Sequence, residues 1–211
     1  VAEQNPSQES VQALAEAFRE LERSVEKILS YSRLISDLSA GRQLRPQWAR
    51  ERIPAIVREA ASYFESEARR LNVTLITQCS GEEEPVWTDA QFIFRIIQNL
   101  VGNALRAVAE RAAIEDLKSN CKVTVRTVQD KHGCTIEVSD TGSGMPPEMV
   151  RRILDGTAVS RWTTRSGSGW GTKIVRELTS ALGGTLSIES TPGTGTVFRI
   201  KLPLSENVPS R

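Results

Sequence analysis

Three clusters of amides, charged residues and glycines in this sequence have residue types that could bind a nucleotide. In the first, Asn99, Asn103 and Arg106 lie within an otherwise apolar segment. Their spacing of four and then three places them on one face of a helix. Amide oxygens could face a magnesium ion or its water, and the guanidinium could face a phosphate. A polar stripe that faces solvent would explain the same pattern about as well.

The second cluster, Asp140-Thr-Gly142-Ser-Gly144, directly follows a predicted strand. Glycines at the end of a strand let the backbone approach a ligand closely. A carboxylate at the base of such a loop can accept a hydrogen bond from an exocyclic amine such as that of adenine. Taken alone, the cluster is equally compatible with a simple turn.

The third cluster, Gly167-Ser-Gly169-Trp-Gly171-Thr172, precedes a predicted helix. Glycines ahead of a helix N-terminus expose backbone N–H groups at the positive end of the helix dipole, where a phosphate binds readily. The pattern is not a P-loop, because no Gly-Lys-Ser/Thr follows, and it is not the fingerprint of a dinucleotide-binding strand–helix–strand unit.

A long helix is predicted over residues 7–38, which contain neither Gly nor Pro. The apolar residues of this segment alternate in steps of three and four, interrupted only at Ser32: Val11, Leu14, Phe18, Leu21, Val25, Ile28 and Ile35. This heptad pattern is typical of a helix that packs along a partner helix. We therefore expect a homodimer through this helix, although a core helix of one compact domain would also fit.

Residues 46–211 are predicted to form a separate domain, with the boundary to residues 1–45 marked by Gly41 and Pro46. Apolar periodicity and turn residues predict helices over residues 50–70, 146–154 and 172–182, and one that begins after an N-cap at Asp89. Strands are predicted over residues 73–77, 121–129, 134–139, 185–190 and 196–202. This order indicates an α+β fold, a two-layer sandwich with helices on one face of a sheet. The polar segment 155–171 is a candidate lid.

The composition excludes several classes of protein. A formal net charge of +1 provides no general basic field for nucleic acid. No run approaches the roughly 20 apolar residues of a membrane span, and the N-terminus lacks a signal-peptide pattern. Three cysteines without a CxxC pair are neither a disulfide framework nor a zinc site. These features predict a cytoplasmic domain; whether a longer parent chain is anchored in a membrane stays open.

Taken in order, the three clusters and the ending resemble the histidine-kinase branch of the ATPase superfamily that includes gyrase and MutL. The resemblance covers about residues 50–204 and is most specific over residues 89–203. Residues 99–103 resemble the asparagine box of that branch, and the two Gly-containing clusters resemble its two glycine boxes. Residues 183–203 resemble its closing hairpin. Residues 7–38 resemble the second helix of its dimerisation and phosphotransfer domain.

The resemblance implies specific roles for these residues. Asn103 would coordinate Mg²⁺, Arg106 would replace the usual phosphate-contacting Lys, and Asp140 would hold the adenine amine. Thr196 matches the adenine-contacting Thr of the closing hairpin. Because Asn99 stands where related ATPases have a water-activating Glu, the resemblance favours phosphoryl transfer to a side chain over hydrolysis. The ligands would be ATP or ADP with Mg²⁺, and the partner would be the receiver domain of a response regulator.

The sequence departs from this family in two respects. The phenylalanine box between the glycine boxes is not clear in residues 153–164. The acceptor histidine, which the family carries on the first helix of the phosphotransfer domain, is also missing. The single histidine, His132, is predicted at a hairpin tip. Either the acceptor lies outside this chain, or the protein is a nucleotide-responsive pseudokinase or scaffold.

Overall fold

The computed structural model divides the chain into two compact units, Val1–Leu44 and Arg45–Arg211. It describes residues 44–81, 84–115, 120–131, 133–157 and 171–203, together with six single residues: Leu14, Phe18, Val25, Ser32, Ser36 and Ala40. In the first unit, five of these single residues, from Leu14 to Ser36, are helical. Leu14 and Phe18 are each 58% exposed and Val25 is 47% exposed. The described part of the predicted heptad seam thus presents apolar side chains at its surface.

A five-stranded sheet is the centre of the described second unit. It consists of β2 (Thr74–Gly81), β4 (Lys122–Asp130), β5 (Gly133–Asp140), β6 (Thr185–Thr191) and β7 (Gly195–Pro203), in the order β2-β4-β5-β7-β6. β2 runs parallel to β4, and every other neighbouring pair is antiparallel. The hairpin predicted from residue 121 to residue 139 is therefore confirmed, and so is the closing hairpin. His132 lies outside the described residues.

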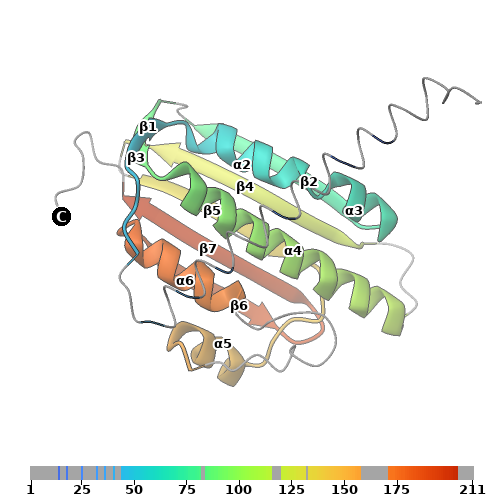
Figure 1. Cartoon of the computed structure of the whole chain (residues 1–211). Coiled ribbons are helices and arrows are strands. Elements are labelled where there is room, and N and C mark those ends of the chain that lie inside the picture. Colours follow the sequence, from blue (N-terminus) through green and yellow to red (C-terminus); the bar gives the residue numbers. More distant parts are fainter. Residues whose placement is uncertain are drawn as a thin grey trace, which may run out of the picture. The chain divides into compact units, whose positions relative to one another are not determined.

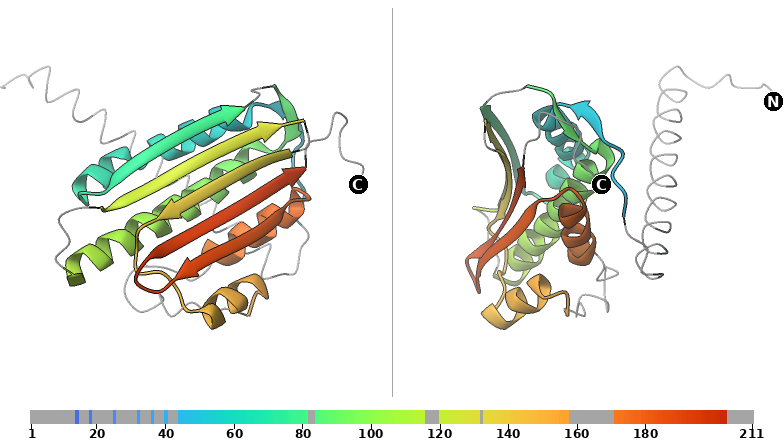
Figure 2. Two further views of the ribbon diagram at one scale, coloured as in Figure 1. Left: turned by 180° about the vertical axis from the view of Figure 1, so that it is seen from behind. Right: turned by 90° about the vertical axis from the view of Figure 1, so that its left-hand side faces the viewer.

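Three helices cover one face of this sheet: α2 (Ile53–Ser62), α4 (Ala90–Glu115) and α6 (Gly171–Ala181) (Figure 1). Seen from the side, the helices and the sheet form two layers (Figure 2). The core between them is aliphatic, since Ile93, Ile97 and Leu100 of α4 pack with at most 1% exposure. The sheet contributes alternate residues such as Val125 and Ile136, both fully buried. The two-layer α+β sandwich predicted from the sequence is confirmed.

The prediction of one helix over residues 50–70 is wrong at the start of that range and in its middle. Residues Ala49–Glu51 form β1, which pairs with β3 (Val86–Thr88), and α2 starts only at Ile53. A turn at Tyr63 and Phe64 separates α2 from α3 (Glu65–Arg70). Phe64 is only 6% exposed, so the apolar pattern continues across the break. A three-residue strand such as β1 carries too little periodicity to be recognised, and it forms only because a distant segment pairs with it.

Asp89 caps α4, as the sequence predicts. Its Oδ1 accepts a hydrogen bond from the backbone N–H of Phe92, at 3.0 Å, and its carbonyl accepts the first helical bond from Ile93. The second oxygen, Oδ2, accepts from the backbone N–H of Gln47 at 2.7 Å. The carboxylate of Asp89 therefore caps the longest described helix and also binds the backbone of Gln47, in the segment before β1.

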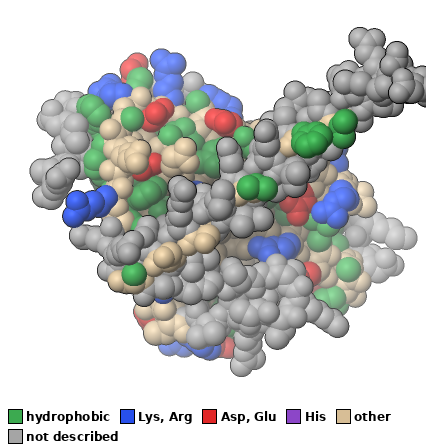
Figure 3. Space-filling view, in the orientation of Figure 1, with side chains coloured by type: hydrophobic (Ala, Val, Ile, Leu, Met, Phe, Trp, Pro, Cys, Tyr) green, Lys and Arg blue, Asp and Glu red, His purple; other side chains and the backbone are tan. Residues whose placement is uncertain are grey.

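Charged side chains of both signs intermingle on the described surface. On the face of the sheet away from the helices, Arg199 pairs with Glu137, at 2.6 Å, and with Glu189. On the described part of the opposite side, Lys and Arg side chains lie interspersed with Asp and Glu (Figure 3). No described helix combines the length and the apolar character that crossing a membrane requires.

Cys134 on β5 is expected to resist alkylation in the folded protein. It is 1% exposed, and burial raises the pKa of its thiol to about 12, so almost no reactive thiolate forms at pH 8. Cys79 and Cys121 are partly exposed and should react first. Iodoacetamide labelling followed by peptide mass spectrometry tests this order, with protein unfolded in guanidinium as the control in which all three cysteines react. Equal labelling of Cys134 and Cys79 in the folded protein would contradict it.

Candidate functional site

Asp140 is the last residue of β5, where the chain leaves the sheet between β4 and β7. Its Oδ1 accepts a hydrogen bond from the backbone N–H of Gly142 at 2.8 Å. Burial raises the pKa of the Asp140 carboxyl to about 6, against the opposing effect of hydrogen bonds from the N–H groups of Gly142 and Thr196. A partly buried carboxyl with this pKa is an ionised acceptor at neutral pH, and it takes up a proton in mildly acidic solution.

The glycines of the second cluster allow the loop after β5 to lie against its neighbours. A Cβ atom at Gly142 would lie 2.8 Å from the Cβ atom of Ala107 on α4. A Cβ atom at Gly144 would lie 2.0 Å from the carbonyl oxygen of Thr191 at the end of β6. The alternative of a simple exposed turn does not account for these contacts, because the loop is packed between a helix and a hairpin.

Thr196 on β7 faces the same loop and is 6% exposed. Its Oγ1 lies 2.9 Å from Ser190 Oγ on β6. Ser190 Oγ donates to the carbonyl of Gly195 at 3.1 Å and accepts from the backbone N–H of Met145 at 2.8 Å. In the pair formed by Ser190 and Thr196, either hydroxyl can be the donor. Sequence reasoning missed Ser190, since a serine in an edge strand carries no distinguishing pattern.

On α4, Asn99 and Asn103 lie one turn apart on the same face, as predicted. Asn99 is 9% exposed, and its Nδ2 donates to the carbonyl of Arg95 at 2.8 Å. Asn103 Oδ1 accepts from Arg106 Nη2 at 2.6 Å, and Arg106 Nε donates to the carbonyl of Gly102 at 3.0 Å. The alternative of a polar stripe that faces solvent is therefore wrong for Asn99, which is buried.

The first residue of α6 lies against both amides. A Cβ atom at Gly171 would lie 3.1 Å from Asn99 Oδ1 and 3.4 Å from Asn103 Nδ2. Thr172 follows in the first turn of α6. Gly167 and Gly169, and residues 158–170 of the candidate lid, lie outside the described residues. The structure thus brings the beginning of the helix after the third cluster to the amides of the first.

Residues 99, 103, 107 and 111 of α4 follow one another at intervals of four and form a ridge, which we call the α4 ridge. Its two asparagines lie at Gly171, Ala107 lies at Gly142, and Arg111 Nη1 donates to the carbonyl of Thr141 at 3.0 Å. At 1.5 Å per residue the ridge is about 18 Å long. It therefore connects the start of α6 to the loop that carries Asp140, so that one helix positions both ends of an elongated site.

The residues on this ridge have the chemistry of a site for magnesium and phosphate. Asn99 and Asn103 offer neutral amide oxygens, which Mg²⁺ accepts as ligands together with phosphate oxygens and water. In this structure the guanidinium of Arg106 donates a hydrogen bond to Asn103 Oδ1. The Oδ1 atom of Asn103 therefore already attracts a cation. The described residues contain no group of three or more His, Cys, Asp and Glu side chains that could hold a metal alone. A magnesium ion here would therefore depend on ligands from a bound phosphate.

Comparison with known proteins supports an ATP site. A family model described as histidine kinase-, DNA gyrase B- and HSP90-like ATPase matches residues 88–206. The sensor protein EvgS of Escherichia coli (strain K12) is 31% identical over 173 residues, which cover 79% of this chain and 14% of EvgS. The sensor protein IrlS of Burkholderia pseudomallei (strain K96243) is 28% identical over 198 residues, covering 90% of this chain and 40% of IrlS. The chain thus spans less than half the length of either relative.

Solved structures have the same fold. Full-length ShkA in complex with AMPPNP aligns with a TM-score of 0.66 at 22% identity, covering 98% of this chain and 41% of that one. The catalytic domain of the histidine kinase ThkA aligns with a TM-score of 0.60 at 24% identity, covering 74% of this chain and 97% of that domain. The family resemblance inferred from the sequence is confirmed by the family model, and these structures confirm the fold.

Proposed function

Since this chain belongs to the histidine kinase-, DNA gyrase B- and HSP90-like ATPases, we propose that it is the ATP-binding catalytic region of a two-component sensor histidine kinase. The observation that carries the proposal is the α4 ridge, which places two amides at the start of α6 and Ala107 against the loop of Asp140. A nucleotide would lie along the ridge, with the base at Asp140 and the phosphates at the asparagines.

Each end of the site has a defined task. The ionised Asp140 carboxylate accepts a hydrogen bond from the adenine amine, and Thr196 contacts the base beside it. At the other end, Arg106 would contact a phosphate, and the family resemblance assigns backbone N–H donors for the phosphates to Gly167, Gly169, Gly171 and Thr172. Asn103, with Asn99 beside it, would hold Mg²⁺, which supplies charge neutralisation at the phosphates when bound. These residues position the γ-phosphate, and phosphoryl transfer needs little further covalent chemistry from the protein.

Calorimetric titration with ADP and with ATP, in the presence and absence of Mg²⁺, tests the nucleotide part of this proposal. We expect binding of one nucleotide per chain that is tighter when Mg²⁺ is present. GDP is the matched control, because guanine has a carbonyl at the position where adenine has the amine that would donate a hydrogen bond to Asp140. Absence of binding, or equal binding of ADP and GDP, would overturn the proposal.

Asn103→Ala is expected to remove most of the effect of Mg²⁺ on nucleotide binding. The variant lacks the amide oxygen that would face the ion, so the affinity for Mg-ATP should fall by about 10-fold while the affinity without Mg²⁺ changes little. Gln98→Ala, an amide on the same helix but off the ridge, is the control and should behave as the wild type. A variant at Asn103 with unchanged dependence on Mg²⁺ would exclude this residue as the ligand.

We propose that the phosphoryl group passes to a histidine elsewhere in a longer protein and then to an aspartate of a response-regulator receiver domain. The exposed apolar residues of the N-terminal helix, Leu14, Phe18 and Val25, support a homodimer through that helix. A longer chain incubated with labelled ATP should acquire acid-labile phosphate, as phosphohistidine does. Acid-stable label on serine would contradict the proposed acceptor.

A further inference from the structure

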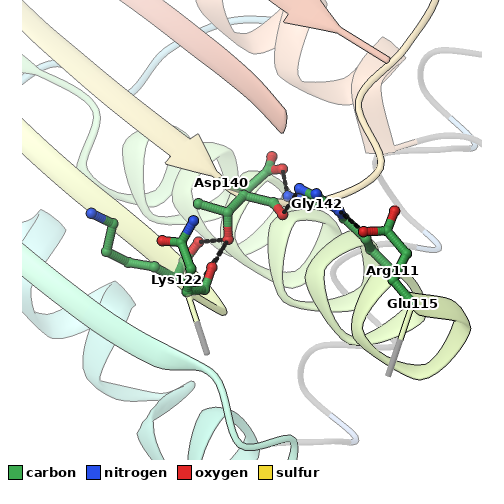
Figure 4. A network of polar contacts seen from close by, with 7 residues as sticks. Arg111, Glu115, Lys122, Asp140 and Gly142 are labelled. Carbon is green, nitrogen blue, oxygen red and sulfur yellow. Dashed lines mark hydrogen bonds and ion pairs between the residues drawn. The ribbon is translucent and has the colours of Figure 1, made fainter. Parts of the chain in front are cut away.

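Arg111, the last member of the α4 ridge, has no role in the nucleotide binding proposed above, yet it makes two specific polar contacts. Its Nη1 donates to the carbonyl of Thr141 at 3.0 Å, and its Nε pairs with Glu115 Oε2, also at 3.0 Å (Figure 4). The Arg111 side chain is only 19% exposed, whereas that of Glu115 is 43% exposed. Arg111 is therefore held at the loop after β5 rather than extended into solvent.

The acceptor of Arg111 belongs to the same peptide group whose N–H binds Asp140. The carbonyl of Thr141 accepts from Arg111, and the N–H on the other side of that peptide bond, at Gly142, donates to Asp140 Oδ1 at 2.8 Å. A peptide group is planar, so a hydrogen bond at its oxygen also fixes the direction of its N–H. A positive charge at the oxygen also strengthens the hydrogen bond that the N–H donates.

Thr141 is held from the other side by the start of β4. Its N–H donates to the carbonyl of Lys122 at 3.1 Å, and its Oγ1 donates to the carbonyl of Asn120 at 2.6 Å. The same Oγ1 accepts from the N–H of Lys122 at 3.0 Å. The strand thus anchors the N–H and the hydroxyl of Thr141, while α4 anchors its carbonyl. Arg111 is the α4 side chain that makes this second anchor.

We propose that Arg111 is a positioning residue of the base pocket, which aligns the Thr141–Gly142 peptide and through it the carboxylate of Asp140. This inference rests on the proposed function, because it assigns Asp140 to the recognition of adenine. Arg111 does not touch the base. It sets the direction in which Asp140 presents its second oxygen, and it thereby contributes to the discrimination between adenine and guanine nucleotides.

Arg111→Met tests this role, because methionine keeps much of the aliphatic length and removes the donors. We expect faster hydrogen exchange at the Gly142 amide in the nucleotide-free protein, measured by NMR. We also expect about 10-fold weaker ADP binding with a smaller preference for ADP over GDP. Arg111→Lys, which can still donate to Thr141, should recover most of the affinity. The thermal unfolding midpoint of each variant, measured in parallel, identifies any general loss of stability.

Glu115→Gln is the matched control, since it removes the ion pair of Arg111 but not the contact with Thr141. Its ADP affinity and Gly142 exchange should stay within about twofold of the wild type, as expected for an exposed ion pair. The inference would be overturned if Arg111→Met left both the hydrogen exchange of Gly142 and the preference for ADP unchanged. It would also be overturned if Arg111→Lys restored neither the slow exchange of Gly142 nor the preference for ADP. If the wild type bound no ADP, the proposed function would fail, whereas the exchange measurements would still report whether Arg111 holds the peptide.

Discussion

Asp140→Asn is expected to abolish measurable ADP binding, with a loss of affinity of about 100-fold or more, and to leave the domain folded. The substitution replaces a charged acceptor by an amide of the same shape, and losing a charge-assisted hydrogen bond costs about 2–3 kcal/mol. The amide can also turn its NH₂ group toward the adenine amine, which would leave two donors facing each other. Calorimetry measures the affinity, and circular dichroism establishes that the fold is retained.

Asp130→Asn is the matched control for this substitution. Asp130 lies at the other end of the same hairpin, where its Oδ1 accepts from the N–H of Gly133 at 3.1 Å. The Asp130→Asn variant should bind ADP as tightly as the wild type does. Unchanged ADP affinity in Asp140→Asn would remove Asp140 from the site and, with it, the proposed orientation of the nucleotide.

The same substitution should change the pH dependence of stability. Because the folded-state pKa of Asp140 is raised from 3.8 to about 6, its contribution to stability is fully present below pH 3.8 and is lost as the pH rises through 6. Asp140→Asn cannot ionise, so its free energy of unfolding should rise by about 2–3 kcal/mol relative to that of the wild type between pH 4 and pH 7.5. Urea denaturation at both pH values measures this difference. A constant difference between the two proteins would show that the carboxyl of Asp140 has an ordinary pKa.

Gly195→Ala is expected to destabilise the domain by about 3–5 kcal/mol and to weaken ADP binding as well. Gly195 begins β7 with a φ of +137°, a conformation that other residues rarely adopt. A Cβ atom there would lie 2.0 Å from the carbonyl oxygen of Asp140, across the pairing of β5 with β7. The alanine must therefore push β7 away from the base of the site. Urea denaturation and calorimetry measure the two effects.

Gly193→Ala separates steric conflict from backbone conformation. Gly193 also has a positive φ, +74°, but nothing lies within 4 Å of a Cβ atom built there. The Gly193→Ala variant should lose about 1 kcal/mol of its free energy of unfolding, the ordinary cost of a left-handed conformation, and keep its affinity for ADP. Equal losses of stability in the two variants would mean that the approach of β7 to Asp140 is not the cause.

Local sequence patterns were sufficient for the individual parts of this site. The apolar periodicity around Asn99 and Asn103 predicted a helix with both amides on one face, and Asp89 predicted its start. The glycines after Asp140 predicted a loop at a strand end. These predictions succeeded because helix periodicity, caps and turn residues depend on neighbours within a few positions of the chain.

Only the tertiary structure decided which parts meet and which additional residues support them. Pairing across the chain formed β1 with β3 and the parallel pair of β2 with β4, neither of which the sequence analysis anticipated. Packing also gave functions to residues with no local signal: Ser190 joins the loop after β5 to β7, and Arg111 reaches the peptide after Asp140. Their partners lie 30 or more positions away along the chain, or on another strand. Hydrogen bonds across such distances depend on the docking of helices onto the sheet, which no short-range pattern in the sequence encodes.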